Sequence, residues 1–346
     1  MNIKQTLLDL CAPSGIAGDE NEAAAHIARL LEPFGGVMRN PLGSVICRVW
    51  EAAPGQPHLL LDAHLDEVGL IVTHIEDSGF LRVGGCGGID RRALPASPVI
   101  IHGKKGKING VICSSPPHLE GGKEKKFAPV DELYIDIGHT KEQAQRLISP
   151  GDRVSLNAPS RQLLGDKICG KALDNRAGCV SLLYALELLR DVQPGCGLSV
   201  IFSTLEETGG QGAKTAAHQL RPTHAVVVDT SFAHTPDSAK TKCGIMGKGP
   251  MIGVAPILSR EMADRLIRVA EAQSIPYQHE VMAGPTGANA DHIAATRAGV
   301  ATGLVSIPLK YMHTPVECAA LPDIENTGRL LAAFVKDFAA ERGGAQ

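Results

Sequence analysis

A histidine and an aspartate follow a short apolar run near residue 60. The run 59–61 is three leucines, typical of a β-strand, and His64 and Asp66 come shortly after it. Because side chains alternate between the two faces of a strand, residues two apart lie on the same side. This spacing suits a metal-bound imidazole with a carboxylate behind it. A His–Asp pair alone is more often a surface hydrogen bond, so the interpretation depends on further ligands elsewhere in the chain.

Further chemically active side chains come just after apolar runs, at four other places in the chain. The carboxyl ends of parallel strands meet at one edge of a sheet, so these side chains are predicted to converge with His64. Converging carboxylates repel one another unless cations lie between them. Two histidines, two aspartates and one glutamate suit two zinc- or cobalt-class ions that share one carboxylate, and a second glutamate is left as a general base for a hydrolase. The four places are Asp174, the pair Glu206–Glu207, Asp229 and His313.

Each of these residues also has an ordinary structural interpretation. Glu206 and Glu207 alone suggest a solvated turn, and Asp174 alone suggests a helix N-cap. Asp229 alone could cap or turn the chain, and His313 alone could be a hydrogen-bond partner in a loop. Their occurrence together, each after its own apolar run, favours a dinuclear hydrolase over these separate explanations.

The elements that must position these residues alternate between strand and helix, except in one central block. The alternation predicts an α/β fold with a helix-covered, mostly parallel sheet. Between residues 70 and 159, short β-type runs separated by glycines predict a small β-barrel. We therefore expect a discontinuous catalytic domain, 1–69 and 160–346, with a β domain, 70–159, inserted into it. The polar segment 121–126 within the insertion is predicted to be mobile.

The composition is that of a globular chain and excludes several partners. The chain has 346 residues, of which 44% are hydrophobic and 21% are charged. Its net charge of -3 gives no electrostatic reason to expect nucleic acid or an anionic membrane as a partner. No apolar stretch is long enough to span a bilayer, and the N-terminal segment does not have the pattern of a signal peptide. Nine scattered cysteines without a Cys-x-x-Cys pair favour a reduced, cytoplasmic location.

The motifs around the candidate residues resemble those of the M42 metallo-aminopeptidases. This family includes glutamyl aminopeptidases and the tetrahedral (TET) aminopeptidases, and some relatives carry the name endoglucanase M. The resemblance covers nearly the whole chain and implies a zinc-peptidase-like α/β fold with a PDZ-like inserted β domain. The matching stretches are AHLDEVG at 63–69, GKKGKINGVI at 103–112, IDIG at 135–138, KALDNRAG at 171–178, EE at 206–207, VD at 228–229, GKGP at 247–250 and YMHTPVE at 311–317.

The resemblance implies a role for each metal-ligating residue. His64, Asp174 and Asp229 would hold one divalent ion. Asp174, Glu207 and His313 would hold the other, so that Asp174 bridges the two. Zinc or cobalt is expected, and manganese can share such ligands.

The resemblance also implies catalytic roles, a substrate and an assembly. Glu206 would be the general base and acid, and Asp66 would lie behind His64, fixing its tautomer and raising its basicity. The enzyme would be an aminopeptidase that releases N-terminal residues from short peptides. The inserted domain would mediate a homo-oligomer, from dimer to dodecamer. The chain departs from the usual family pattern at 208–211, at 289–292 and at Lys310, which bears on substrate preference and assembly rather than on the ligands.

Alternative functions remain open at this point. A metal-dependent deacylase of N-acyl amino acids or amino sugars would use the same residues. A non-catalytic, metal-stabilised assembly protein is disfavoured, because it would not need an unligated Glu206. A cysteine hydrolase is disfavoured because Cys169, Cys179 and Cys243 have no partner pattern. An endoglucanase is disfavoured because one Trp and four Tyr offer few stacking surfaces for a sugar. The sequence leaves open the preferred N-terminal residue, the native metal and the size of the oligomer.

Overall fold

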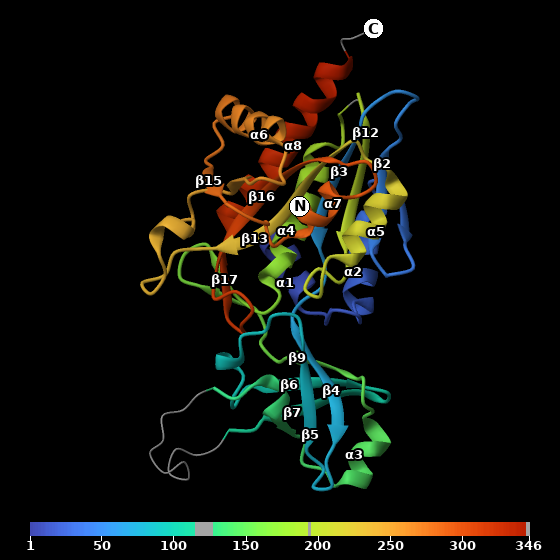
Figure 1. Ribbon diagram of the computed structural model, residues 1–346, viewed down its shortest axis with the longest axis vertical. Coiled ribbons are helices and arrows are strands. Elements are labelled where there is room, and N and C mark those ends of the chain that lie inside the picture. Colours follow the sequence, from blue (N-terminus) through green and yellow to red (C-terminus); the bar gives the residue numbers. More distant parts are fainter. Residues whose placement is uncertain (115–126, 193–194, 344–346) are drawn as a thin grey trace.

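The computed structural model describes residues 1–114, 127–192 and 195–343. It consists of a large α/β part and, below it in Figure 1, a smaller β part with one helix beside it. The predicted fold class, an α/β fold with an inserted β-barrel, is confirmed. The segment 121–126, which we expected to be mobile, lies outside the described residues. No helix in the described part of the chain is long and apolar enough to cross a membrane.

The large part is built on one eleven-stranded sheet whose four central strands are parallel. The flanking pairs β1–β2, β2–β12, β16–β17, β17–β11 and β11–β10 are antiparallel, so the sheet is mixed where the sequence predicted a mostly parallel one. Short connections join several of these flanking strands, and only antiparallel strands can be joined in this way. Across the sheet the order is β1 (Gly36–Arg39), β2 (Val45–Trp50), β12 (Gly197–Ser203), β3 (His58–His64), β13 (His224–Phe232), β16 (Ala301–Lys310), β17 (Glu317–Ala320), β11 (Lys167–Gly170) and β10 (Arg161–Leu163), while β14 (Met251–Val254) pairs with β16 and β15 (Gln278–Val281) pairs with β14.

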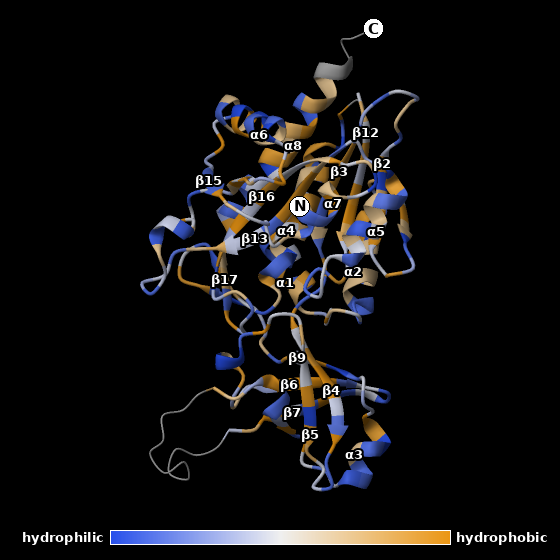
Figure 2. Cartoon of the chain, viewed as in Figure 1, coloured by the Kyte–Doolittle hydropathy of each residue, from blue (hydrophilic) through white to orange (hydrophobic). Residues whose placement is uncertain are grey.

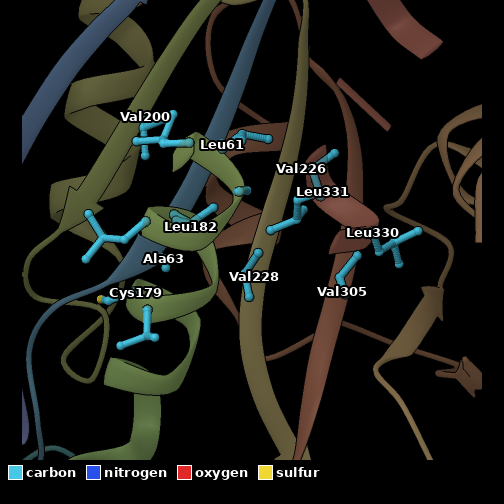
Figure 3. Close-up of a cluster of buried hydrophobic side chains, with 14 of the residues drawn as sticks. Leu61, Ala63, Cys179, Leu182, Val200, Val226, Val228, Val305, Leu330 and Leu331 are labelled. Carbon is cyan, nitrogen blue, oxygen red and sulfur yellow. The ribbon is translucent and has the colours of Figure 1, made fainter. Parts of the chain in front are cut away.

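Helices cover both faces of this sheet, because its central strands are apolar on both sides. Along β3, Leu61 and Ala63 join one buried cluster, whereas Leu60 joins a second cluster on the opposite face. Figure 3 shows Cys179 and Leu182 of α4 in the first cluster, and Figure 2 shows the apolar colouring of the central strands. The first cluster includes residues of α1 (Ile3–Cys11), α2 (Asn21–Leu31), α4 (Leu173–Leu188), α6 (Arg260–Ala272) and α8 (Leu321–Gly343), and the second includes residues of α5 (Gln211–Leu220) and α7 (Asn289–Ala294).

The smaller part is a closed antiparallel barrel with its own apolar core. The chain enters the barrel directly after β3, and all buried residues of its core lie between Val68 and Leu156. The helix α3 (Lys141–Leu147) begins with a capping box formed by Thr140 and Gln143. In barrel order the strands are β4 (Gly69–Ile75), β5 (Leu81–Cys86), β8 (Tyr134–Asp136), β7 (Gly106–Ile112), β6 (Pro98–Gly103) and β9 (Arg153–Leu156). Short 3₁₀ helices lie at Arg91–Ala93 and Val130–Glu132 in this part, and at Lys240–Lys242 in the large part.

Two central strands are longer than their apolar runs. The residue pattern predicts strands over 225–228 and 301–306, but β13 and β16 continue to Phe232 and Lys310. The two extensions pair with each other in parallel. Their backbone N–H and C=O groups therefore form hydrogen bonds whichever side chains the strands carry. We had expected Asp229 to follow the end of a strand, but it lies within one.

Candidate active site

The predicted site residues come together at the carboxyl end of the parallel strands. His64 is the last residue of β3 and pairs with Ser203, the last residue of β12, whose following loop carries Glu206 and Glu207. The β3–β13 register aligns Asp62 with Val227, so its continuation puts Asp229 level with His64. Asp174 comes from the first turn of α4, and His313 comes from the loop after β16. A cavity of about 440 Å³ is lined by all six side chains predicted as metal ligands or general base: His64, Asp174, Glu206, Glu207, Asp229 and His313.

The side chains form two groups that share Asp174. His64 Nε2 lies 3.2 Å from Asp174 Oδ1 and 3.4 Å from Asp229 Oδ1. His313 Nε2 lies 3.4 Å from Asp174 Oδ2 and 3.3 Å from Glu207 Oε1. Each oxygen of the Asp174 carboxylate therefore faces a different histidine. This is the arrangement expected of a bridging carboxylate.

These donor atoms fit divalent metal ions. A tetrahedral zinc site with bonds of about 2.0–2.1 Å places its ligand atoms about 3.3–3.4 Å apart, close to the separations observed. One donor atom from each of His64, Asp174 and Glu207 lies within 4.8 Å of the others. Glu207 Oε1 is buried and makes no aligned hydrogen bond, and such orphaned acceptors are rare unless a ligand completes them. Imidazole and carboxylate are also the ligand types that zinc-class ions prefer.

Both histidines are oriented by a backbone carbonyl. The Nδ1 atom of His64 lies 3.2 Å from the carbonyl oxygen of Asp66, and that of His313 lies 2.9 Å from the carbonyl oxygen of Gly88. A carbonyl only accepts, so Nδ1 is the donor, and Nε2 faces the carboxylates. Gly88 follows β5, so the inserted barrel contributes to the site. A Cβ atom at Gly88 would lie 3.2 Å from His313 Nδ1, so this close approach favours glycine.

Asp66 lies beside His64, but its carboxylate has a different main partner from the one the resemblance implies. The carboxylate Oδ1 is 3.7 Å from His64 Nδ1, which is too long for a hydrogen bond. Instead, it accepts hydrogen bonds from the backbone N–H groups of Glu206 (3.0 Å) and Glu207 (3.1 Å). Asp66 is fully buried. Its carbonyl orients the histidine, and its carboxylate holds the loop that carries both glutamates.

A buried glutamate that sequence reasoning named only as part of a motif supports two of the candidate ligands. Glu317 Oε1 accepts from the backbone N–H of His313 (2.9 Å), and its Oε2 accepts from that of Asp174 (3.1 Å). Its position four residues after His313 in an apolar segment was the available signal. The N-cap interpretation of Asp174 does not apply, because the neighbouring Asn175 side chain accepts from Gly178 N (3.1 Å). Asp174 and Asn175 have non-helical backbone angles, and the peptide bond between them is cis.

The charges in this cavity are crowded. Burial, opposed by His64 and reinforced by the carboxylates of Asp229 and Glu207, raises the pKa of Glu206 to about 9. Burial would lower the pKa of His313, but the Asp174 and Glu207 carboxylates raise it to about 11. Burial would also lower the pKa of His64, but the carboxylates around it raise this pKa well above 6.5. In the described part of the chain, the Glu206 carboxylate makes no hydrogen bond or ion pair, so it is free to take up a proton.

Unusual backbone conformations concentrate at the site. Eight non-glycine residues in the described ranges have a positive φ. Four of them adjoin or belong to the candidate set: Ala172 (60°), Leu205 (60°), Tyr311 (58°) and His313 (63°). Such left-handed conformations cost of order 1–3 kcal/mol each and cluster where function requires a particular geometry.

Comparisons with known proteins agree with this geometry. The family model described as M42 glutamyl aminopeptidase matches residues 43–330. The lysyl aminopeptidase of Pyrococcus furiosus is 30% identical over 301 residues, which cover 86% of this chain and 86% of that protein.

Solved structures agree as well. An aminopeptidase from the archaeon Desulfurococcus kamchatkensis superposes with a TM-score of 0.91 at 31% identity, covering 99% of this chain and 98% of that one. The TET1 peptidase of Pyrococcus horikoshii, which can assemble into a tetrahedron or a large octahedral shell, superposes with a TM-score of 0.85 at 32% identity, covering 96% and 98%. The resemblance inferred from the sequence motifs is thereby confirmed. The chain belongs to the M42 family of aminopeptidases, and it is a peptidase.

Proposed function

We propose that this M42 aminopeptidase uses two divalent metal ions to release the N-terminal residue from short peptides. The observation that carries the proposal is the orientation of Asp174, whose two oxygens face His64 and His313 separately. A single-metal site would have no need for a carboxylate that is shared in this way. The family is one of metallopeptidases, which supports the use of divalent ions.

Each ion has a proposed set of ligands in this chain. His64, Asp174 and Asp229 hold one ion, and Asp174, Glu207 and His313 hold the other. Zinc or cobalt suits these nitrogen and oxygen donors best, and manganese is an alternative. When bound, such ions act as Lewis acids that acidify water and polarise a carbonyl oxygen.

Glu206 is the proposed general base and acid. Its carboxylate faces the same cavity as the ligands and has no competing hydrogen bond in the described residues. Bound cations would favour its ionised form over the protonated form of the metal-free protein, so it can accept a proton from the attacking water. It then donates that proton to the nitrogen of the leaving amine as the peptide C–N bond breaks. Asp66 positions Glu206 through the backbone, because it accepts from the Glu206 N–H. The proton count balances: one proton leaves the water and one arrives on the amine.

The charge of the cavity favours an N-terminal residue over an internal one. Among the residues that the structure describes, the lining contains five carboxylates, those of Asp174, Glu206, Glu207, Asp229 and Glu280, and no lysine or arginine. Even with two divalent ions bound, five ionised carboxylates outnumber the four positive charges, so a free α-ammonium group is attracted to this surface, whereas an acylated nitrogen is not. This supports exopeptidase action.

The test is hydrolysis of a panel of aminoacyl anilides beside their N-acetylated counterparts. The free amines are expected to be hydrolysed and the acetylated forms to be resistant, because only the free amines carry the positive charge. Dialysis against a chelator should abolish hydrolysis, and zinc or cobalt should restore it. A preference for the acetylated substrates would instead favour the metal-dependent deacylase. Activity that survives complete metal removal would contradict the proposal.

Metal binding should release protons at neutral pH. The pKa of His313 is raised to about 11 and that of His64 is also raised. Both imidazoles are therefore cationic, with a proton on each ring nitrogen, at pH 7 in the metal-free protein. A ligating imidazole must be neutral, so the ion displaces that proton. Calorimetric titration with zinc in buffers of different ionisation enthalpy should show a heat that varies with the buffer.

A matched pair of variants separates this effect from protonation elsewhere in the chain. His313→Gln should reduce the number of protons released. His139→Gln, at an exposed position in the barrel, should leave the number unchanged. A heat of binding that is independent of the buffer would contradict the assignment of the histidines as ligands.

We further propose a domain division, an assembly and a location. The separate apolar core of the barrel supports a division into a catalytic domain, 1–69 and 160–346, and an inserted domain, 70–159. The assembly of the P. horikoshii relative supports a homo-oligomer here, from dimer to dodecamer, formed through the inserted domain. All nine cysteines are free, which suits a reducing compartment and supports a cytoplasmic location.

A further inference from the structure

A fifth carboxylate in the cavity has no part in the proposed mechanism. Glu280 on β15 lines the same cavity as the candidate metal ligands. One of its oxygens accepts a hydrogen bond from the Ser231 hydroxyl, and the other accepts from the Ser306 hydroxyl at 2.6 Å. The carboxylate is thus held in place by two neutral groups that come from two different strands.

The strand register places the partners of Glu280 close to the candidate metal ligands. Ser306 pairs with Asp229 across β16 and β13, and Ser231 lies two residues beyond Asp229 on the same face. Neighbouring strands are about 4.8 Å apart, and residues two apart on a strand are about 6.6–6.8 Å apart. The partners of Glu280 are therefore one strand, or two residues, away from a candidate metal ligand. Glu280 therefore lines the same cavity as the candidate ligands without belonging to either ligand group.

The Glu280 carboxylate retains capacity for a further donor. A carboxylate has about four lone-pair sites, and the two serine hydroxyls use two of them. In the described part of the chain, no lysine, arginine or histidine is ion-paired with Glu280. The lining of the cavity also includes the apolar side chains of Phe232, Ala288, Leu304 and Met312.

We infer that Glu280 binds the cationic side chain of an N-terminal lysine or arginine and makes the peptidase selective for basic N-terminal residues. This inference rests on the proposed aminopeptidase function. The methylene stem of lysine or arginine matches the apolar wall, and its charged end matches the carboxylate. The family names do not decide this point, because they include both glutamyl and lysyl aminopeptidases.

The first experiment compares kcat/KM for lysyl, arginyl, leucyl and glutamyl anilides in the wild type, Glu280→Gln and Glu32→Gln. Glu32 is exposed and outside the cavity, so its variant is a control for the same chemical change. The wild type should prefer the lysyl and arginyl substrates. Glu280→Gln should lower the lysyl-to-leucyl ratio of kcat/KM by at least about tenfold, as expected for loss of a hydrogen bond to a charged group. Glu32→Gln should leave the ratio unchanged.

Three outcomes of the kinetic experiment would overturn the inference. An equal loss for lysyl and leucyl substrates would mean that Glu280 binds the α-amino group of every substrate. An unchanged ratio, with only a lower thermal unfolding temperature, would mean that Glu280 merely holds β15 to its neighbours. A wild-type preference for the glutamyl substrate would also overturn it.

The second experiment measures binding without catalysis, so that the two proposals can fail separately. Calorimetry compares L-lysine with L-norleucine, which has the same stem length but no terminal ammonium group. Lysine should bind the wild type at least about tenfold more tightly than norleucine, and Glu280→Gln should remove the difference. Equal binding of the two amino acids to the wild type would overturn the inference even if the enzyme is active. Failure to hydrolyse any anilide would overturn the proposed function, whereas selective lysine binding would still support Glu280.

Discussion

Replacement of Glu206 by glutamine is expected to lower kcat by about 10²–10⁴-fold while both metal ions stay bound. Glutamine has nearly the same shape as glutamate but cannot take a proton from water. The Glu206 carboxylate is outside the two groups of donor atoms around Asp174, so metal binding does not depend on it. The measurements are kcat on a good aminoacyl anilide and metal content by mass spectrometry.

The neighbouring residue is the matched control. Glu207→Gln makes the same chemical change one position later, but the Glu207 carboxylate lies 3.3 Å from His313 Nε2 and belongs to a ligand group. This variant should lose metal as well as activity. Unchanged turnover in Glu206→Gln would remove Glu206 from the mechanism, and loss of metal in that variant would make it a ligand.

The raised pKa of Glu206 provides a second readout in the metal-free protein. Because its pKa is about 9 in the folded state against 4.5 in the unfolded chain, this group stabilises the fold fully only below pH 4.5. That contribution is lost as the pH rises from 4.5 towards 9. The glutamine variant has no such group, so its thermal unfolding temperature should exceed that of the metal-free wild type by more at pH 8 than at pH 5.

The fold was predictable from the sequence wherever an element carries its own pattern. Apolar spacing and local breakers predict helices over 3–11 and 141–147, and the helices Ile3–Cys11 and Lys141–Leu147 have these bounds. The strands β10, β11, β14 and β17 were not predicted. They are three or four residues long and owe their conformation to pairing with distant strands.

The part of the site that could be predicted from the sequence consists of acidic side chains and histidines that follow apolar runs. That pattern singled out His64, at the carboxyl end of β3, and His313, just after the carboxyl end of β16, with β13 between the two strands. It could not identify Gly88, which is 225 residues from its partner His313 in the sequence, nor Glu280, whose position depends on the pairing of β15 with β14. Contacts of this kind exist only after the chain has folded.

Asp66 shows where a local rule fails. Strand alternation predicted that His64 and Asp66 share a face, but β3 ends at His64, so the rule stops applying one residue later. The chain turns there, and the Asp66 carboxylate meets the N–H groups of Glu206 and Glu207 instead. The sequence named the residue as a candidate, whereas its hydrogen-bond partners depend on a loop 140 residues away.

Asp174→Ala is expected to abolish the binding of both metal ions, and turnover with it. Its Oδ1 is the closest carboxylate oxygen to His64 Nε2 at 3.2 Å, and its Oδ2 is 3.4 Å from His313 Nε2. Removing the shared carboxylate takes one ligand from each ion. It also removes negative charge from between two cations, whose mutual repulsion is then unscreened. Metal content and activity, measured after dialysis against buffer with limiting zinc, test this expectation.

Asp229→Ala is the control that makes the test specific to bridging. Asp229 lies 3.4 Å from His64 Nε2, and the only imidazole with which it is paired in the described residues is His64, so its loss should weaken one ion and leave the ion at His313 in place. The two alanine variants remove the same buried chemical group, so a general cost of losing a carboxylate would affect them equally. Only a shared ligand makes Asp174→Ala lose twice as much metal as Asp229→Ala. Equal losses would mean that each ion has its own carboxylates, and the crowding of acidic groups at this sheet edge would then need another explanation.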